Sequence, residues 1–225
     1  NACGDVCPKG AITFQTDKEG FWYPEINQDL CIDCGLCQKT CPVLTKADNV
    51  IRYDEPLVYA AYTKDEAIRT DSTSGGIHSM LALAMYEQNA YIGGAIYNKD
   101  HTVKHIVSPD CQLLPEIRSS KYLQSSMEGA YKEVRDLLKA GEKVFFCGTP
   151  CQIQGLYKFL RKEYDNLTTC DFICRGVNSP KVFLSYMDML EKQYGSKATQ
   201  IKFKNKKWGW HNFSMRVNFE NGQEY

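Results

Sequence analysis

Two kinds of apolar spacing follow one another along this chain. AITFQTDKEGFWYPEI (11–26) alternates apolar and polar residues around a Lys-Glu-Gly turn, which predicts a two-stranded hairpin. From residue 57 onward, short apolar runs such as YIGGAIY and VFFCG alternate with helical patterns. This alternation predicts an α/β domain with a mixed, partly parallel sheet and helices packed on its faces.

The helical patterns also predict which residues enter the core. The residues that fall on one stripe are Ile77, Met80, Leu81, Ala84 and Met85 in the first long pattern, and Phe183, Tyr186, Met187 and Leu190 in the last. The segment TKADNVIRYDEP (45–56) is polar, has no sustained period and ends in proline, which predicts a linker. We therefore expect a small module over residues 1–48 and a larger domain over residues 57–225.

Composition narrows the class of protein. Its 225 residues suit two domains, and its 27 basic and 27 acidic residues cancel, so nothing favours nucleic acid as a partner. No run approaches the ~18 apolar residues of a membrane span. Eleven cysteines, six of them in the first 41 residues, favour metal or redox chemistry in a reducing, cytoplasmic compartment over a disulfide framework.

CIDCGLCQKTCP (31–42) is the most specific motif. Its four cysteines, Cys31, Cys34, Cys37 and Cys41, have the bacterial ferredoxin spacing, in which three cysteines bind one 4Fe-4S cluster and the fourth binds a neighbouring cluster. Zinc sites usually pair two CxxC knuckles across a longer gap, and disulfides between cysteines this close are strained. The spacing therefore favours an iron–sulfur cluster.

A second, partial copy of the motif opens the chain. CGDVCP contains Cys3 and Cys7 at the spacing of the last two ferredoxin cysteines. Crossed ligation then predicts that Cys7 completes the cluster of Cys31, Cys34 and Cys37, while Cys3 and Cys41 bind the other cluster. We expect the first two cysteines of this copy to precede residue 1. The segment would then be a bacterial-type ferredoxin module that is cut within its motif. One of its two cluster sites would be complete.

Two hydroxyl-rich loops precede or follow predicted helices, where an α/β sheet places ligands. TDSTSGGIH (70–78) suits a diphosphate and, equally well, an ordinary helix N-cap. In IRSSKYLQSS (117–126), Lys121 and Tyr122 suit a phosphate clamp and a ring contact, although alone the segment resembles a solvated surface loop.

Two further loops carry cysteine directly after an apolar run. In FFCGTPCQIQG (145–155), Cys151 falls in the first turn of a predicted helix, where the helix dipole favours a thiolate, and Cys147 is expected in the core. CDFICRGVNSP (170–180) repeats the arrangement and places Cys174 at the same sheet edge. The pair is either half of a metal or cluster site or two unrelated thiols.

Together these segments resemble a known family. CIDCGLCQKTCP, STSGGI, SSKYLQS, CGTPCQIQGL, ICRGVNSP and WGW are similar to the coenzyme F420 hydrogenase/dehydrogenase beta subunits, which are flavin iron–sulfur proteins. The resemblance implies an FAD-binding domain whose cofactor residues are Ser74, Gly75, Gly76, Ile77, Ser119, Ser120, Lys121, Tyr122, Gly148 and Thr149. It also implies a 4Fe-4S cluster bound in part by Cys151 and Cys174. The family's remaining ligands come from a later CxxC-type segment that this sequence lacks, so we expect a C-terminal truncation.

The resemblance leads to a functional expectation. The protein is expected to be an iron–sulfur flavoprotein oxidoreductase that passes electrons between a hydride carrier, coenzyme F420-like or another reductant, and 4Fe-4S clusters via FAD. Its partner would be a redox protein or a hydride-carrying coenzyme, and the flavin, not a side chain, would carry the catalysis. Two alternatives stay open: a non-catalytic electron-relay subunit of a larger redox complex, and a thiol-dependent enzyme that uses Cys151.

Overall fold

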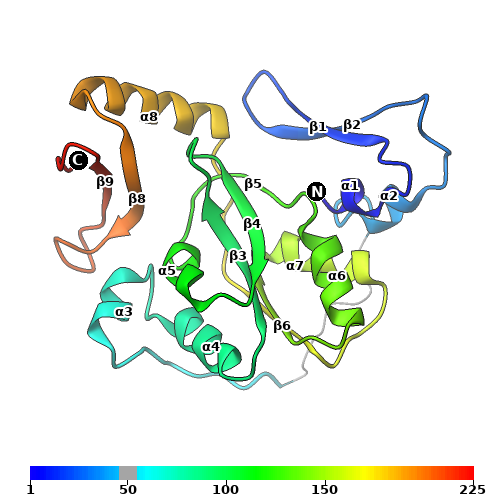
Figure 1. Ribbon diagram of the computed structural model, residues 1–225, viewed down its shortest axis with the longest axis horizontal. Coiled ribbons are helices and arrows are strands. Elements are labelled where there is room, and N and C mark those ends of the chain that lie inside the picture. Colours follow the sequence, from blue (N-terminus) through cyan, green and yellow to red (C-terminus); the bar gives the residue numbers. More distant parts are fainter. Residues whose placement is uncertain (46–54) are drawn as a thin grey trace.

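A computed structural model describes residues 1–45 and 55–225. Most of the predicted linker, residues 46–54, therefore lies outside the described residues. The first 45 residues form a small module (Figure 1). Its elements are α1 (Ala2–Val6), β1 (Ile12–Thr16), β2 (Trp22–Ile26) and α2 (Leu36–Thr40).

The predicted hairpin is confirmed. Strands β1 and β2 are antiparallel, with Ile12 opposite Ile26. One carboxylate oxygen of Asp17 accepts hydrogen bonds from the backbone N–H groups of Glu19 and Phe21, at 3.0 and 2.8 Å, and so closes the turn. Gly20 completes it with φ of +90°, a conformation that L side chains rarely adopt.

The rest of the described chain is built around a mixed sheet, as predicted. Within the described ranges this sheet has five strands in the order β5-β4-β3-β6-β7. The β3–β4 pair is antiparallel, whereas β4–β5, β3–β6 and β6–β7 are parallel. Its elements and those around it are α3 (Glu66–Asp71), α4 (Ile77–Tyr86), β3 (Tyr91–Tyr97), β4 (Val103–Ser108), the 3-10 turn η1 (Cys111–Leu113), α5 (Leu114–Ile117), β5 (Ser125–Ser126), α6 (Ala130–Lys139), β6 (Val144–Gly148), α7 (Pro150–Leu160) and β7 (Leu167–Asp171).

Helices cover both faces of this sheet (Figure 1). Successive side chains of a strand point to opposite faces, so Phe145 packs with the residues of α4 and α5, and Phe146 packs with those of α6 and α7. At Gly93 an added Cβ would collide with the Phe146 ring, so this glycine lets the ring lie across β3. The core is thus divided by the sheet into two apolar clusters.

A third apolar cluster lies under the C-terminal elements. Helix α8 (Pro180–Tyr194) packs with the antiparallel pair β8 (Ala198–Asn205) and β9 (Ser214–Phe219). The predicted core positions Phe183 and Leu190 are buried here. The corresponding prediction for α4 is only partly right. Met85 packs against the core, but Met80, Leu81 and Ala84 are exposed, and Ser79 and Ala82 are buried instead. Helix α4 is apolar nearly all round, so its periodicity selects no single face.

The module docks on the larger domain through buried polar contacts. Asp5 of α1 is 4% exposed, and its two carboxylate oxygens accept hydrogen bonds from the N–H groups of Gly129 and Tyr131, at 2.8 and 3.1 Å. Asp5 thus satisfies free N–H groups at the start of α6. The Gln124 side chain exchanges two hydrogen bonds with the backbone of Trp22, and Ser179 Oγ donates to Glu19 O at 2.6 Å.

Candidate functional site

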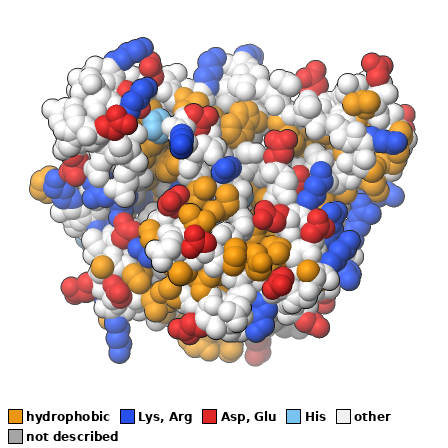
Figure 2. Space-filling model, in the orientation of Figure 1, with side chains coloured by type: hydrophobic (Ala, Val, Ile, Leu, Met, Phe, Trp, Pro, Cys, Tyr) orange, Lys and Arg blue, Asp and Glu red, His pale blue; other side chains and the backbone are white. Residues whose placement is uncertain are grey.

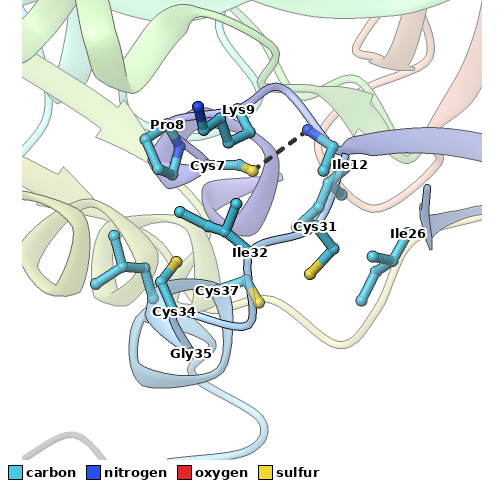
Figure 3. A pocket seen from close by; sticks show the side chains of 12 residues that line it. Cys7, Pro8, Lys9, Ile12, Ile26, Cys31, Ile32, Cys34, Gly35 and Cys37 are labelled. Carbon is cyan, nitrogen blue, oxygen red and sulfur yellow. Dashed lines mark hydrogen bonds between the residues drawn. The ribbon is translucent and has the colours of Figure 1, made fainter. Parts of the chain in front are cut away.

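Four cysteines of the module line one hollow of about 30 Å³. They come from three segments: Cys7 follows α1, Cys31 and Cys34 lie in the stretch before α2, and Cys37 lies within α2. Figure 3 shows the four side chains around this hollow, with Ile12, Ile26 and Ile32 beside them. The four cysteines are those that the ferredoxin spacing assigns to the complete cluster.

The local backbone conformation places these cysteines around the hollow. Asp33 has φ of +50° and Gly35 has φ of +67°, so the stretch between Cys31 and Cys37 curls tightly before α2 begins. The Ala11 N–H donates to Cys7 Sγ at 3.3 Å (Figure 3). Hydrogen bonds of this kind to ligand sulfurs are one means by which proteins set cluster potentials.

The chemistry of the donor set fits a cluster better than a single ion. One zinc ion with Zn–S bonds of ~2.3 Å draws its sulfurs to within ~4 Å of one another. Among the described residues no three His, Cys, Asp or Glu side chains converge in that way. A cluster binds each thiolate through a different iron, so its sulfurs stand around a volume rather than a point. Four cysteines around an apolar hollow meet that requirement.

Cys3 and Cys41 form a second, separate group. Cys3 lies in α1 and Cys41 directly follows α2, and these two helices contact each other. Burial raises the pKa of the Cys3 thiol, and the charge of Cys41 acts in the same direction. Neither residue lines the hollow of Cys7. The structure thus separates the six N-terminal cysteines into the groups that crossed ligation predicts, while the ligand assignments themselves stay predictions.

The two hydroxyl-rich loops lie side by side. Ser119 Oγ donates to the backbone oxygen of Asp71 at 2.6 Å, and the Ser120 N–H donates to Thr73 Oγ1 at 2.9 Å. Arg118 Nη1 lies 3.0 Å from Asp71 Oδ2. Segments far apart in the sequence therefore form one polar cluster, as a shared cofactor site would require.

Sequence reasoning missed the lysines that strand β8 and its following turn bring to this cluster. Lys202 Nζ lies 2.6 Å from Asp71 Oδ1, and Lys206 Nζ donates to the backbone oxygens of Arg69 and Ser74. Burial acts to raise the pKa of Asp71, but the hydrogen bonds and charges of Lys202 and Arg118 outweigh it and lower that pKa. The only sequence signal was a lysine at an inward position of the strand.

The glycine loop is covered in this structure. The Thr63 N–H donates to Gly75 O at 2.8 Å, and a Cβ at Gly75 would come within 3.0 Å of Ala61 O. A Cβ at Gly76, whose φ is +84°, would lie 2.6 Å from Thr63 Cγ2. Both glycines thus allow residues 61–63 to pack on the loop, and exposed Ser74 and half-buried Ile77 flank that contact.

Lys121 and Tyr122 also have partners within the protein. Lys121 Nζ donates to the backbone oxygens of Ile117, Arg118 and Ser119, at 3.0, 3.1 and 3.2 Å, and burial lowers its pKa to about 7. Its ammonium group therefore binds the end of α5. The Tyr122 ring meets Phe203 edge to face, with 5.3 Å between centroids.

A large hollow adjoins this polar cluster. It has a volume of about 1100 Å³ and lies between the loop at 118–121 and the elements α8 and β8. Ser119, Ser120 and Lys202 contribute to its lining. The volume is sufficient for a cofactor. A flavin fits these residues only in part. The hollow has room for it, but Arg118, Lys121 and Lys202 already bind oxygen atoms of the protein.

Cys151 and Cys174 are both exposed near the carboxyl ends of β6 and β7. Cys151 lies in the first turn of α7, with its Sγ 3.1 Å from Thr149 Oγ1, and Cys174 Sγ accepts the Gly176 N–H at 3.4 Å. Thr149 and Gln152 form a capping box that begins α7 after Gly148, so the predicted helix start is confirmed. Within the described ranges, neither cysteine belongs to a group of three or more side chains that could hold a metal ion.

Comparison with known proteins agrees with this architecture. Residues 1–45 match the family model of the 4Fe-4S dicluster domain. Residues 141–224 match the family model of the C terminus of the coenzyme F420 hydrogenase/dehydrogenase beta subunit. The chain is therefore similar, in its C-terminal part, to the coenzyme F420 hydrogenase/dehydrogenase beta subunits. Its N-terminal module is therefore a ferredoxin-type 4Fe-4S domain.

Individual relatives match different parts of this chain. A coenzyme F420-dependent sulfite reductase of Methanocaldococcus jannaschii is 30% identical over 162 residues, which cover 69% of this chain and 24% of that protein. The ferredoxin-type protein NapF of Escherichia coli is 42% identical over 41 residues, or 18% of this chain and 25% of NapF. The chain thus spans about a quarter of the length of these curated relatives.

Among solved structures, a chain of the F420-reducing NiFe hydrogenase complex from Methanosarcina barkeri has a TM-score of 0.48 and 20% identity. The match covers 72% of this chain and 57% of that one. None of the helices within the described ranges has the length and apolar character to cross a bilayer. Figure 2 shows apolar patches among side chains of both charge signs on one face, consistent with the balanced charge.

Proposed function

We propose that this protein is an iron–sulfur flavoprotein oxidoreductase that passes electrons between a hydride carrier and 4Fe-4S clusters via FAD. The observation that carries the proposal is the hollow lined by Cys7, Cys31, Cys34 and Cys37. It lies in a module whose helices α1 and α2 contact α7, the helix that begins with Pro150 and Cys151. We also propose residues 1–48 and 57–225 as the two functional units.

The chain's own residues then have definite roles. Cys7, Cys31, Cys34 and Cys37 would hold the complete cluster, and Ile12 and Ile26 would keep water from it. Cys3 and Cys41 would supply ligands to the second cluster of the module. Cys151 and Cys174 would supply part of a third site at the sheet edge.

We place the flavin in the hollow beside Ser119 and Ser120. Bound FAD supplies the exchange between two-electron hydride chemistry and one-electron cluster chemistry. Arg118 and Ser119 would hold the two loops together, through Asp71, at the wall of this site. Contact of the cofactor with Gly75 and Gly76 would require residues 61–63 to move away from the loop.

Metal and sulfide analysis tests the cluster. After anaerobic reconstitution, the protein should contain about four irons and equal sulfide for the complete site. Cys37→Ser should remove most of them, whereas Cys111→Ser, at an exposed cysteine outside the module, should leave the content unchanged. Stoichiometric zinc in place of iron under reducing, anaerobic conditions would contradict the proposal.

Flavin binding separates the proposal from an electron-relay subunit. The relay is the second candidate because, among the described residues, the glycine loop is covered and Lys121 binds backbone oxygens. The oxidoreductase should bind FAD and reduce an artificial dye, and Ser119→Ala should weaken FAD binding. A protein with intact clusters and no flavin would be the relay.

The remaining alternative is a thiol-dependent enzyme that uses Cys151. It predicts that alkylation of Cys151 stops turnover without loss of iron.

A further inference from the structure

Cys147 and Cys170 face each other across two neighbouring strands. Strands β6 and β7 are parallel, and their register places Cys147 directly opposite Cys170. Paired residues of neighbouring strands project to the same face, and Cys170 packs against the apolar cluster that contains Phe145, two residues before Cys147. Both cysteines are half-buried. The prediction that Cys147 lies simply in the core missed this pairing.

We propose that Cys147 and Cys170 are a redox-active dithiol that forms a reversible disulfide between β6 and β7. This site goes beyond the proposed function and does not depend on it. Neighbouring strands run ~4.8 Å apart, and disulfides usually join Cα atoms ~4.4–6.8 Å apart, so the bridge needs no change of register.

The two thiols also differ in reactivity. The neighbouring Cys170 side chain is the leading cause of the raised pKa of Cys147, followed by burial. The same interaction lowers the pKa of Cys170. Of the two thiols, Cys170 is therefore the one that loses its proton more readily. A lowered pKa identifies the attacking sulfur in thiol exchange, since the thiolate is the nucleophile.

The reaction needs an external disulfide as oxidant, for which glutathione disulfide is the probe. The Cys170 thiolate attacks one of its sulfurs, and one glutathione thiolate leaves. Cys147 then gives up its proton and attacks Cys170 of the mixed disulfide, which releases the second glutathione. One S–S bond is broken and one is formed, and two electrons pass from the protein to glutathione.

Such a bridge is expected to be easily reduced. A disulfide draws its Cβ atoms to ~3.8 Å, which is closer than the strand spacing. Strained disulfides have more oxidising potentials and are the labile ones. The bridge therefore suits a switch or a store of reducing equivalents better than a permanent structural link.

Peptide mapping of the whole protein tests the proposal. The reduced protein is treated with glutathione disulfide, free thiols are alkylated, and trypsin releases peptides 144–158 and 163–175. A disulfide-linked pair should appear, with a mass two hydrogens below the sum of the two reduced peptides. Because Cys151 and Cys174 lie in the same peptides, fragment ions must place the link on Cys147 and Cys170. Dithiothreitol should reverse it.

Variants provide matched controls. Cys147→Ser and Cys170→Ser should each lower the linked fraction at least tenfold, whereas Cys151→Ser and Cys174→Ser should leave it unchanged. The mapping of the unaltered protein stands even if a variant fails to fold. Absence of the linked pair, or a link that fragment ions place on Cys151 and Cys174, would overturn the proposal.

Discussion

At the residue scale, the most informative side chains are polar groups in apolar surroundings. His105 is 8% exposed, stacks on Phe146, and has no partner for its Nδ1. Burial lowers its pKa to about 3, and the positive charge of Lys121 acts in the same direction. The imidazole is therefore neutral throughout the physiological pH range and serves to pack the core. At acid pH its burial lowers the stability of the folded protein.

His105→Phe should make stability less dependent on pH. Below the pKa of ~6.5 in the unfolded chain, the unfolded state takes up a proton that folded His105 does not bind, so stability falls as pH decreases. Between pH 7 and pH 5 the original protein should lose about 2 kcal/mol more than the variant. Urea unfolding across this range measures the difference. Parallel curves for the two proteins would show that His105 titrates normally when folded.

Asp5 carries the contact between the module and α6. Asp5→Ala should lower the free energy of unfolding by about 1–3 kcal/mol, because the N–H groups of Gly129 and Tyr131 lose their buried acceptor. Asp5→Asn keeps one acceptor oxygen and should lose less. Thermal or urea unfolding measures both variants. Equal losses for the two variants would show that the acceptor oxygen kept by Asn contributes nothing to stability.

At the element scale, the sequence predicted the turns and the ends of helices better than it predicted which face of a helix is buried. The hairpin turn at 17–20 and the start of α7 at Thr149 and Pro150 are set by local residues, and both predictions are confirmed. The buried face of α4 was predicted only in part, since Met85 packs on the core but the neighbouring elements also bury Ser79 and Ala82. Capping is local, whereas the buried face depends on what packs there.

Gly20→Ala tests how the hairpin docks on α8. Gly20 has φ of +90°, and an added Cβ would collide with Lys181 Cβ and Ser179 Oγ at the start of that helix. Gly10→Ala is the matched control, because Gly10 also has positive φ, of +60°, but has open space around it. Gly20→Ala should destabilise the protein by about 1–3 kcal/mol more than Gly10→Ala in urea unfolding. Similar losses would show that backbone strain alone matters.

At the scale of the whole molecule, the module and the larger domain share one interface. Ala2 of α1 is part of the apolar cluster of α6 and α7, and Trp22, Asp5 and Glu19 bind residues of the domain. The module lies beside α6 and α7 (Figure 1), and these contacts hold it against the larger domain. A rigid interface suits electron transfer, which depends on a constant separation of cofactors.

Gln124→Ala should loosen this interface without unfolding either part. It removes two hydrogen bonds to the Trp22 backbone, of 2.7 and 2.9 Å, worth about 1–2 kcal/mol together. Amide hydrogen exchange should rise in strands β1 and β2 and stay unchanged in β6 and β7. Gln112→Ala, at an exposed residue, is the control. Unchanged exchange in the hairpin would mean that apolar contacts alone hold the module.

The sequence by itself determined what depends on spacing along the chain. The intervals between Cys31, Cys34 and Cys37 predict the ligands of one cluster, and the alternation of strands and helices predicts the mixed sheet that the structure has, because both patterns are local. Only the tertiary structure decided which distant residues meet. It joined Asp71 to Lys202, covered Gly75 with residues 61–63, and set Cys147 opposite Cys170. Such pairings follow from strand order and packing, which spacing along the chain does not encode.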